Sequence, residues 1–363
     1  CRCMLRRWAV LQRIRSTVPA SFGYLNRIRS RTFYTVRMEI ENTVNPTAEE
    51  SAVFDLLTEA ARESGKGTVL RVAGGWVRDK LMGRHSHDID IALDNVSGVE
   101  FAEHVHSFLL RKGKRTSSVG RIMANPDQSK HLETATMRVC DLAIDFVNLR
   151  SERYAEDSRI PVVEIGTPEQ DAMRRDLTIN ALFYNLNEGS VEDFTGKGLE
   201  DLRKGIIRTP LPPLTTFLDD PLRVLRAVRF ATRFGFEMDG ELCAAAMQDV
   251  VRNALAQKVS RERVGTELGG MLTGPRPAAA LLLLDRLGLF PVVFALPDGI
   301  RDAPPRPFAG AEFVRCVGRL EGLLSAERQP EPGMPGVPVF SEADRQLAGV
   351  AGVGEEAGVA GVG

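Results

Sequence analysis

Two aspartates separated by one residue, Asp88 and Asp90, are the side chains whose spacing most directly indicates chemistry. They stand in the run Asp-Ile-Asp-Ile-Ala-Leu, which is typical of a β-strand, and side chains alternate across a strand, so both carboxylates share one face. Neighbouring carboxylates repel each other, so a fold tolerates them mainly where a cation neutralises both. Carboxylates and substrate phosphates are the usual ligands of Mg²⁺. The pair therefore predicts a Mg²⁺ site that serves a phosphate-containing substrate.

A glycine turn precedes this pair. An apolar run from Val69 to Ala73, interpreted as a strand, ends at Gly74-Gly75, and Arg78 follows on a short helix that ends near Gly83. A glycine turn lets backbone N–H groups approach a phosphate, and Arg78 would add positive charge. The chain has no Gly-Lys-Ser/Thr and no Gly-x-Gly-x-x-Gly motif, which excludes a P-loop and a dinucleotide-binding turn. Together these parts predict a site for a metal-bound nucleoside triphosphate.

A further carboxylate, Asp145, stands between Ile144 and Phe146 in an otherwise apolar strand. This strand is the second of two that we expect within residues 125–152, joined at residues 140–143. Asp145 is either an edge residue that faces water or a third carboxylate of the metal site, on a strand beside that of Asp88 and Asp90. The sequence leaves both interpretations open.

The segment from Asp171 to Leu211 contains an Arg174-Arg175-Asp176 cluster. We expect these residues and Asn180 on one helix that ends near residues 187–189. The cluster could be an ordinary exposed helix start. Asn180, however, interrupts an apolar run, and buried amides are hydrogen-bonded, so its side chain requires a partner.

A stripe of arginines follows on a helix predicted from Phe217 to residue 239. Either Asp219 or Asp220 would cap this helix, and Pro221 suits its first turn. Leu222, Leu225 and Phe230 lie off the stripe and can face the core. An exposed face normally mixes in acids, so arginines without acids between them favour an anionic partner, a phosphate or a base. The stripe consists of four arginines spaced three and four residues apart: Arg223, Arg226, Arg229 and Arg233.

Another helix is expected to begin at Pro46, with Thr47 and Glu50 as its cap. Further helices are expected over residues 99–110, 241–256 and 277–287, and one more is expected to begin at Ser260. The basic run at residues 111–115 is interpreted as a solvated turn that could also meet phosphate.

The composition fits a globular protein of more than one domain. The chain has 363 residues, 43% of them hydrophobic, and a net charge of −1, so any RNA binding must depend on local basic patches. Five scattered cysteines argue against a disulfide framework and for a reducing compartment. The five histidines lack metal-binding spacing, and no apolar run is long enough to span a membrane.

The two ends differ in composition from the middle. Residues 4–37 are rich in arginine, serine and threonine and have no acid, which predicts a transit peptide for mitochondria or plastids; a basic arm that touches RNA is the alternative. A second start at Met38 would give a cytosolic or nuclear form. Pro/Gly-rich sequence follows Pro291, where residues 311–326 alone resemble a packed helix, and we expect the low-complexity end to be disordered.

The motifs in their order resemble those of class II CCA-adding enzymes, in the tRNA nucleotidyltransferase and poly(A) polymerase family. The likeness covers about residues 52–294, and the phrases SKHLETATM and DFVNLRSE are similar to the eukaryotic branch. The motifs that carry this likeness to the family are Gly-Gly-x-Val-Arg-Asp with Asp-Ile-Asp, Arg-Arg-Asp-Leu-Thr-Ile-Asn-Ala-Leu, Asp-Phe-Thr-Gly, Asp-Asp-Pro-Leu-Arg and Ser-Arg-Glu-Arg-x-x-x-Glu.

The resemblance implies an α+β fold: a polymerase-β-type nucleotidyltransferase head, with a mixed sheet and helices, followed by an all-α neck and body. We expect a transit peptide at residues 1–37, the head at 38–211, the neck at 212–275, a partial helical body at 276–326 and a disordered, low-complexity tail at 327–363.

The resemblance also assigns roles to residues. Asp88, Asp90 and Asp145 would be catalytic, with Asp88 and Asp90 as the metal ligands. Asp220 and Arg223 would recognise the base edge, and Arg226 and Arg229 would face phosphates. The complete nucleotide-binding set would be Gly74, Gly75, Arg78, Arg175, Asp176, Asn180, Asp220, Arg223, Arg226 and Arg229.

The implied activity is template-independent addition of CCA to tRNA 3′ ends from CTP and ATP, with Mg²⁺ as cofactor and tRNA as partner. No membrane and no protein partner is expected. Three alternatives share the motifs: an enzyme that adds only A or only CC, a poly(A) polymerase, and an inactive RNA-binding relic. The Pro/Gly-rich end replaces the helical tail that grips tRNA in the family, so we expect CTP and ATP binding but poor handling of tRNA.

Overall fold

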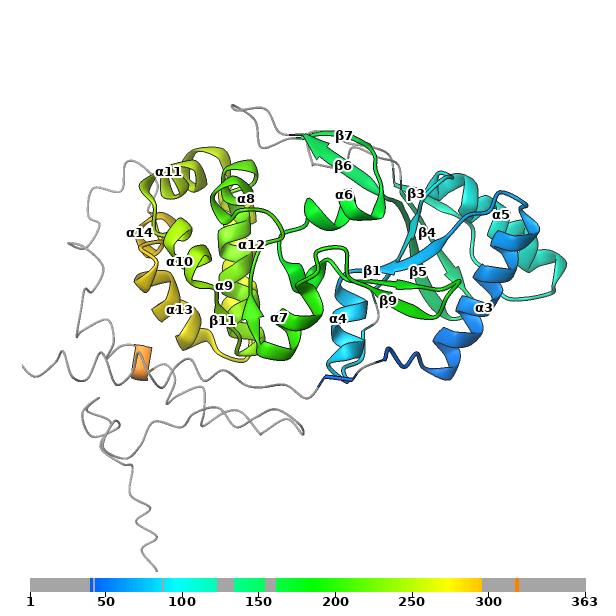
Figure 1. The fold of residues 1–363 in the computed structure, drawn as a ribbon, viewed down its shortest axis with the longest axis horizontal. Coiled ribbons are helices and arrows are strands. Elements are labelled where there is room, and N and C mark those ends of the chain that lie inside the picture. Colours follow the sequence, from blue (N-terminus) through cyan, green and yellow to red (C-terminus); the bar gives the residue numbers. More distant parts are fainter. Residues whose placement is uncertain are drawn as a thin grey trace, which may run out of the picture.

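The computed structural model describes residues 40–41, 43–86, 88–122, 134–153, 161–295 and 317–319. A part built on a β-sheet and a helical part lie side by side along the long axis of the molecule (Figure 1). The first part holds a seven-stranded mixed sheet, and the helices of the second begin at Pro213. This arrangement confirms the predicted α+β fold, a head with a mixed sheet followed by a helical region.

The sheet has the strand order β3-β4-β5-β2-β1-β8-β9. β2 and β5 run parallel, and the other five neighbouring pairs of the described sheet run antiparallel. The strands are β1 (Leu70–Ala73), β2 (Ile89–Leu93), β3 (Gly120–Ile122), β4 (Thr134–Val139), β5 (Leu142–Asn148), β8 (Phe183–Asn185) and β9 (Ser190–Glu192).

One face of the sheet packs on α5 (Gly98–Arg111), which packs in turn on α3 (Ala48–Glu63). A capping box begins α3, because Thr47 and Glu50 exchange hydrogen bonds with each other's backbone N–H, as predicted. Alternate residues of β2 and β5 point into this core and are buried: Ile89, Ile91, Leu93, Ile144 and Phe146. The residues between them point to the opposite face, which is where the acidic residues lie.

The opposite face is partly covered by α6 (Pro168–Met173), which packs on the hairpin of β6 (Arg150–Arg153) and β7 (Val162–Ile165). A short 3₁₀ turn, η2 (Thr178–Asn180), follows α6. Two short helices pack against this turn, α4 (Gly75–Leu81) and α7 (Gly198–Lys204). The turn after β1 and the turn after α6 therefore lie together at one end of the strands of the sheet.

The helical part is organised around α9 (Leu222–Phe234), which contacts α8 (Pro213–Asp219), α12 (Arg261–Leu272) and α13 (Pro277–Arg286). Leu222, Leu225 and Phe230 are buried, as predicted. A two-stranded parallel sheet of β10 (Ile206–Ile207) and β11 (Glu237–Met238) joins the end of the head to the end of α9. The remaining helices are α10 (Gly240–Ala246), α11 (Asp249–Lys258) and α14 (Phe290–Val293).

The prediction of one helix that contains both Arg174 and Asn180 is wrong. α6 ends at Met173, Arg174 is its C-cap, and the chain then forms a turn, η2 and the strand β8. Asp176 explains the break, because its carboxylate accepts hydrogen bonds from the Leu177 N–H and from the Asn180 amide. Such local side-chain bonds offer the backbone an alternative to the helix.

Two other helix boundaries differ from the prediction. The helix expected from Phe217 is two helices, because Asp220 is extended (φ −135°, ψ 100°), as the residue before a proline tends to be. Its side chain accepts from the Leu222 N–H and so does cap α9. The helix expected over residues 241–256 is also two, divided at an extended Gln248, and Asp249 occupies the first turn of α11, where an acid is favourable.

None of the described helices combines the length and the apolar character that a membrane crossing requires. The predicted targeting segment and the predicted tail lie outside the described residues, as does the predicted helix over residues 311–326 apart from residues 317–319.

Candidate active site

Three carboxylates, those of Asp88, Asp90 and Asp145, meet on the open face of the sheet. One carboxylate oxygen of each lies within 4.8 Å of those of the other two. Asp90 and Asp145 are partners in the register of the parallel strands β2 and β5, so their side chains leave the sheet on the same face, and Asp88 stands directly before β2. β5 lies between β2 and β4, so Asp145 is not on an edge strand. The fold thus brings Asp145, for which the sequence left two interpretations open, beside the pair Asp88 and Asp90.

The acidic triad (Asp88, Asp90 and Asp145) is electrostatically unfavourable without a cation. Burial and the charges of Asp88 and Asp145 together raise the pKa of Asp90 to about 6, against the opposing charges of Arg175 and Arg150. A donor set of carboxylate oxygens without histidine or cysteine fits a hard divalent cation such as Mg²⁺. The residues present therefore fit the metal that the family resemblance implies.

The glycine turn between β1 and α4 lies beside the triad. Gly74 has φ +71°, which favours glycine, and a Cβ at this position would stand 2.6 Å from Nη1 of Arg175. Gly75 is the first residue of α4 and lines the cleft. The turn therefore requires glycine at Gly74 for two independent reasons, its backbone conformation and the close approach of an arginine.

Arg78, on α4, is largely enclosed. Its Nε donates to Oδ1 of Asp79 at 2.9 Å and its Nη1 donates to Oδ1 of Asn180. The guanidinium lies over the rings of Phe230 and Phe234, at 5.2 and 4.8 Å from their centroids. With a side chain only 5% exposed, Arg78 connects α4 to η2 and to α9. Its predicted contact with a triphosphate stays a prediction.

Asp171, on α6, orients both arginines of the Arg174-Arg175-Asp176 cluster. Its Oδ1 accepts from Nη2 of Arg174 at 2.6 Å, and its Oδ2 accepts from Nε of Arg175 at 3.0 Å. Burial alone would raise the pKa of Asp171, but the charges of Arg175 and Arg174 outweigh it and hold that pKa below its ordinary value. Arg175 also donates to the backbone carbonyl of Asn180 at 3.1 Å, so it is fixed between α6 and the glycine turn.

Asp176 joins the head to α9. Its carboxylate accepts from the Leu177 N–H at 2.8 Å, from Nδ2 of Asn180 at 3.1 Å and from Nε of Arg226 at 2.6 Å. Burial disfavours its charge, but Arg226 and these hydrogen bonds outweigh burial and lower the pKa to about 2. Asn180 has the partners that the sequence analysis required, because its oxygen accepts from Arg78 and its nitrogen donates to Asp176.

The arginine stripe of α9 faces the cleft and meets acceptors from two directions. Arg223 donates to the backbone carbonyl of Arg174 at 2.9 Å, on the head side. Arg229 donates to Glu267 of α12 at 2.6 Å, on the side of the helical part. Arg226 binds Asp176 between them, and all four arginines of the stripe line the cleft. The stripe is therefore positioned by the protein's own oxygen atoms.

Asp220 lies in the same cleft and is held by Arg263 of α12. Nη2 of Arg263 donates to Oδ2 of Asp220 at 2.9 Å, and Nη1 donates to Oδ1 at 3.4 Å. A carboxylate has about four acceptor positions, so Asp220 retains capacity for another donor.

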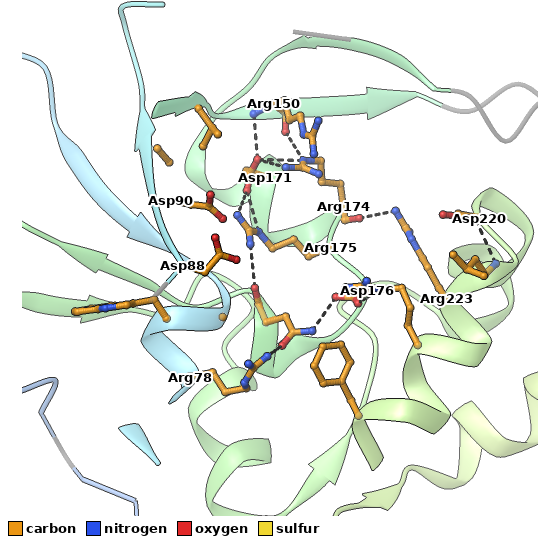
Figure 2. Close-up of a pocket in the computed structure, with 18 of the residues that line it drawn as sticks. Arg78, Asp88, Asp90, Arg150, Asp171, Arg174, Arg175, Asp176, Asp220 and Arg223 are labelled. Carbon is orange, nitrogen blue, oxygen red and sulfur yellow. Dashed lines mark hydrogen bonds and ion pairs between the residues drawn. The ribbon is translucent and has the colours of Figure 1, made fainter. Parts of the chain in front are cut away.

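These groups surround one cleft of about 840 Å³ between the head and the helical part. Figure 2 shows the aspartates Asp88 and Asp90 on one side of it and Asp220 and Arg223 on the other, with Arg175 and Asp176 between them. Nine arginines and seven carboxylates line the cleft, and two of the seven belong to the acidic triad, so the remainder is cationic and suits a polyanion. Every nominated residue lines the cleft except Gly74, which adjoins it, and Asp145, which belongs to the triad.

Two protein-family models match parts of this chain. Residues 70–208 match the family model of the poly(A) polymerase head domain. Residues 235–299 match the model described as the probable RNA- and SrmB-binding site of polymerase A, and together the two matches cover more than half of the chain. The chain belongs to the poly(A) polymerase and tRNA nucleotidyltransferase family.

Curated members of this family include fungal CCA-adding proteins. The chain is 52% identical over 229 residues to the mitochondrial CCA tRNA nucleotidyltransferase of Candida glabrata, a match that covers 62% of this chain and 43% of that protein. It is 50% identical over 244 residues to the mitochondrial CCA tRNA nucleotidyltransferase of Saccharomyces cerevisiae, covering 66% of this chain and 45% of that protein. An A-adding tRNA nucleotidyltransferase of Geobacter sulfurreducens is 33% identical over 220 residues, covering 60% of this chain and 23% of that protein.

Solved structures of the family share the fold. A CCA-adding enzyme in an apo form superposes with a TM-score of 0.62 at 26% identity, over 78% of this chain and 61% of that one. A CCA-adding enzyme in complex with CTP gives a TM-score of 0.59 at 26% identity, over 78% and 58%. The predicted resemblance to CCA-adding enzymes of the eukaryotic branch is thus confirmed. The chain spans less than half of the length of the two fungal relatives.

Four cleft residues were missed as site residues by the family motifs: Arg150, Glu152, Asp171 and Arg263. Each of them had a signal in the sequence. Asp171 stands four residues before Arg175, the spacing of a helical ion pair, and Arg263 is part of the Ser-Arg-Glu-Arg motif. Arg150 and Glu152 belong to the phrase DFVNLRSE, which is similar to the eukaryotic branch, but their place in the cleft depends on the hairpin β6–β7.

Proposed function

We propose that this chain catalyses template-independent nucleotidyl transfer to the 3′ end of tRNA, adding CCA from CTP and ATP and releasing pyrophosphate. The observation that supports the proposal most directly is the acidic triad at one side of an arginine-lined cleft. An inactive RNA-binding protein has no need for three carboxylates within 4.8 Å, which cost free energy without a metal. The names of the two fungal relatives support the same activity.

In this proposal the metal ligands are Asp88 and Asp90, and Mg²⁺ is the ion. Bound there, Mg²⁺ would stabilise negative charge on the reacting phosphoryl group and the leaving pyrophosphate. Asp145, the third carboxylate of the triad, would accept the proton of the attacking 3′ hydroxyl. The new bond joins this oxygen to the α-phosphorus of the nucleotide, and the bond from the α-phosphorus to the pyrophosphate oxygen breaks.

The nucleotide would extend from the glycine turn to α9. Its triphosphate would lie near Gly75 and Arg175, which both line the cleft, and Asp171 holds the guanidinium of Arg175 in place. Its base would meet Asp220 and Arg223, because a carboxylate and a guanidinium together offer acceptors and donors to the edge of cytosine or adenine. Arg226 and Arg229 would complete the cationic wall.

An A-adding enzyme is the second candidate, favoured by the relative of that name at 33% identity. Incorporation of each of the four nucleoside triphosphates into tRNA that ends before CCA, or after CC, separates the two. A CCA-adding enzyme extends both substrates with the correct nucleotides, and an A-adding enzyme extends only the second. Absence of any incorporation by the chain with Mg²⁺ or Mn²⁺ would contradict both.

We also propose that the protein acts in mitochondria. The support is the acid-free, arginine-rich composition of residues 4–37 and the mitochondrial designation of the two fungal relatives. A fluorescent reporter fused behind residues 1–37 should enter mitochondria, whereas a fusion that starts at Met38 should not. A cytosolic signal from the first fusion would contradict the proposal.

A further inference from the structure

Arg150 lines the cleft at the end opposite the glycine turn. β1 runs antiparallel to β2, with Val72 opposite Ile91, so the turn after β1 lies beyond the first residues of β2, near Asp88. β5 runs parallel to β2, with Asn148 opposite Leu93, so Arg150 lies beyond the last residues of β2. The acidic triad therefore stands between the glycine turn and Arg150.

Figure 2 shows the same order: Arg78 at the bottom of the view, Asp88 and Asp90 above it, and Arg150 at the top. Small apolar side chains, Ala92 and Val147, form the floor of the cleft between the triad and Arg150. From Asp90 to the level of Leu93 this floor is about 10 Å long, at about 3.3 Å per strand residue. The cleft thus continues past the triad on the side away from the proposed triphosphate.

The guanidinium of Arg150 is less engaged than those of its neighbours. Within the described residues it has one charged partner, Oε1 of Glu152 at 3.7 Å, and this oxygen binds Arg174 more closely, at 2.9 Å. Arg174 and Arg175, in contrast, each bind Asp171 at 2.6 to 3.0 Å. Arg150 lines the cleft, its side chain is about one-third exposed (34%), and its charge acts on Asp90.

The local scaffold depends on the backbone of Arg150 and not on its side chain. The Arg150 N–H donates to Oδ1 of Asp171 at 3.2 Å, and its carbonyl accepts from Nε of Arg174 at 3.1 Å. Both hydrogen bonds are available to any residue except proline at this position. A substitution of the side chain therefore removes one cleft-facing charge and leaves Asp171 and Arg174 in place.

We propose that the Arg150 guanidinium binds a phosphodiester of the acceptor RNA, next to its 3′-terminal nucleotide, and does not bind the incoming triphosphate. The inference rests on the proposed function, which places the triphosphate at the glycine turn. In phosphoryl transfer the attacking and leaving oxygens are roughly in line, so the 3′ hydroxyl must approach the triad from the side opposite the pyrophosphate. An RNA end in that position passes over Ala92 and Val147 and brings its first phosphodiester toward Arg150, whose planar fork suits a phosphate.

The test compares Arg150→Ala and Arg150→Lys with wild type, and uses Arg62→Ala, an exposed arginine on α3, as the matched control. The substrate is a short tRNA-acceptor hairpin that ends before CCA, and the measurement is the steady-state addition of the first C. Loss of a charge-assisted phosphate contact should raise the KM for the hairpin about ten-fold or more in Arg150→Ala, with the KM for CTP within two-fold of wild type. Lysine should restore part of the loss, and Arg62→Ala should behave as wild type.

Binding of the hairpin without CTP tests the contact independently of catalysis. The salt dependence of log K should become shallower by about one in Arg150→Ala, because one phosphate contact is lost. An increase in the KM for CTP alone, or a fall in kcat with both KM values unchanged, would overturn the proposal. Unchanged hairpin affinity and salt dependence would also overturn it. A wild-type chain that binds the hairpin through Arg150 but adds no nucleotide would contradict the proposed function and leave the contact standing.

Discussion

Replacing Asp90 by asparagine should stabilise the metal-free protein at neutral pH and at the same time abolish nucleotide addition. The pKa of Asp90 rises from its ordinary value of 3.8 to about 6, because of burial and the neighbouring carboxylates. At about 1.4 kcal/mol per pKa unit this difference corresponds to about 3 kcal/mol. Asp90 is partly exposed, and solvent screening reduces the effect, so we expect the variant to gain about 2 kcal/mol of unfolding free energy at pH 7.5.

The sign of the pH dependence follows from the raised pKa. Between pH 4 and pH 6 the folded state binds the Asp90 proton more tightly than the unfolded state does, so the stability of the wild type falls as the pH rises through this window. Asparagine does not titrate. The stability advantage of Asp90→Asn should therefore be small at pH 4 and complete above pH 6.5.

Urea unfolding in the presence of a chelator, at pH 4 and at pH 7.5, measures this difference. Asp55→Asn on α3 is the matched control, because Asp55 is exposed and lies away from the triad. Added Mg²⁺ should stabilise the wild type more than Asp90→Asn, since a ligand that binds the folded state stabilises it. If the chelated variant were less stable than wild type at pH 7.5, the view of the triad as an uncompensated charge cluster would be wrong.

Three further substitutions test other parts of the site. Asp176→Asn should lower stability by about 2 kcal/mol at pH 7, because the pKa of Asp176 falls from 3.8 to about 2 on folding; urea unfolding should show the difference shrink as the pH falls toward 2. Gly74→Ala should lower stability and nucleotide addition together, since it strains a backbone at φ +71° and displaces Arg175; wild-type unfolding and kinetics would contradict this. Asp220→Ala should weaken the preference for CTP and ATP over UTP and GTP by about 1–3 kcal/mol in competition assays, and an unchanged preference would reduce Asp220 to a helix cap.

The pairing of Asp88 with Asp90 and the arginine stripe could be predicted because each depends on a regular period, whereas the place of Asp145 depends on the register of β2 and β5. Alternation along a strand places Asp88 and Asp90 together, and spacing of three and four residues places Arg223, Arg226 and Arg229 on one side of α9. The apolar pattern of α9 also identified its core-facing side correctly, as the burial of Leu222 and Leu225 shows.

The segment after α6 could not be predicted in this way, because side chains and not periodicity determine its path. The carboxylate of Asp176 ends the helical course by binding the backbone of Leu177 and the amide of Asn180. The charge on Asp176 is in turn favourable because Arg226 approaches it from α9, fifty residues later in the chain. A single sequence contains no local signal for a contact of this range.

This same contact explains how the proposed metal site and base-recognising helix keep a fixed relation. Three interactions connect the segment beside the triad to α9: Asp176 binds Arg226, the carbonyl of Arg174 accepts from Arg223, and Arg78 lies over Phe230. Asp171 extends the connection, because it orients Arg174 and Arg175 while Arg175 adjoins the glycine turn. A displacement of α9 would therefore leave the buried carboxylate of Asp176 without Arg226, and an unpaired buried charge is costly. The relation of the triad to Asp220 and Arg223 is consequently fixed by an ion pair, a hydrogen bond and a cation–π contact of the protein itself.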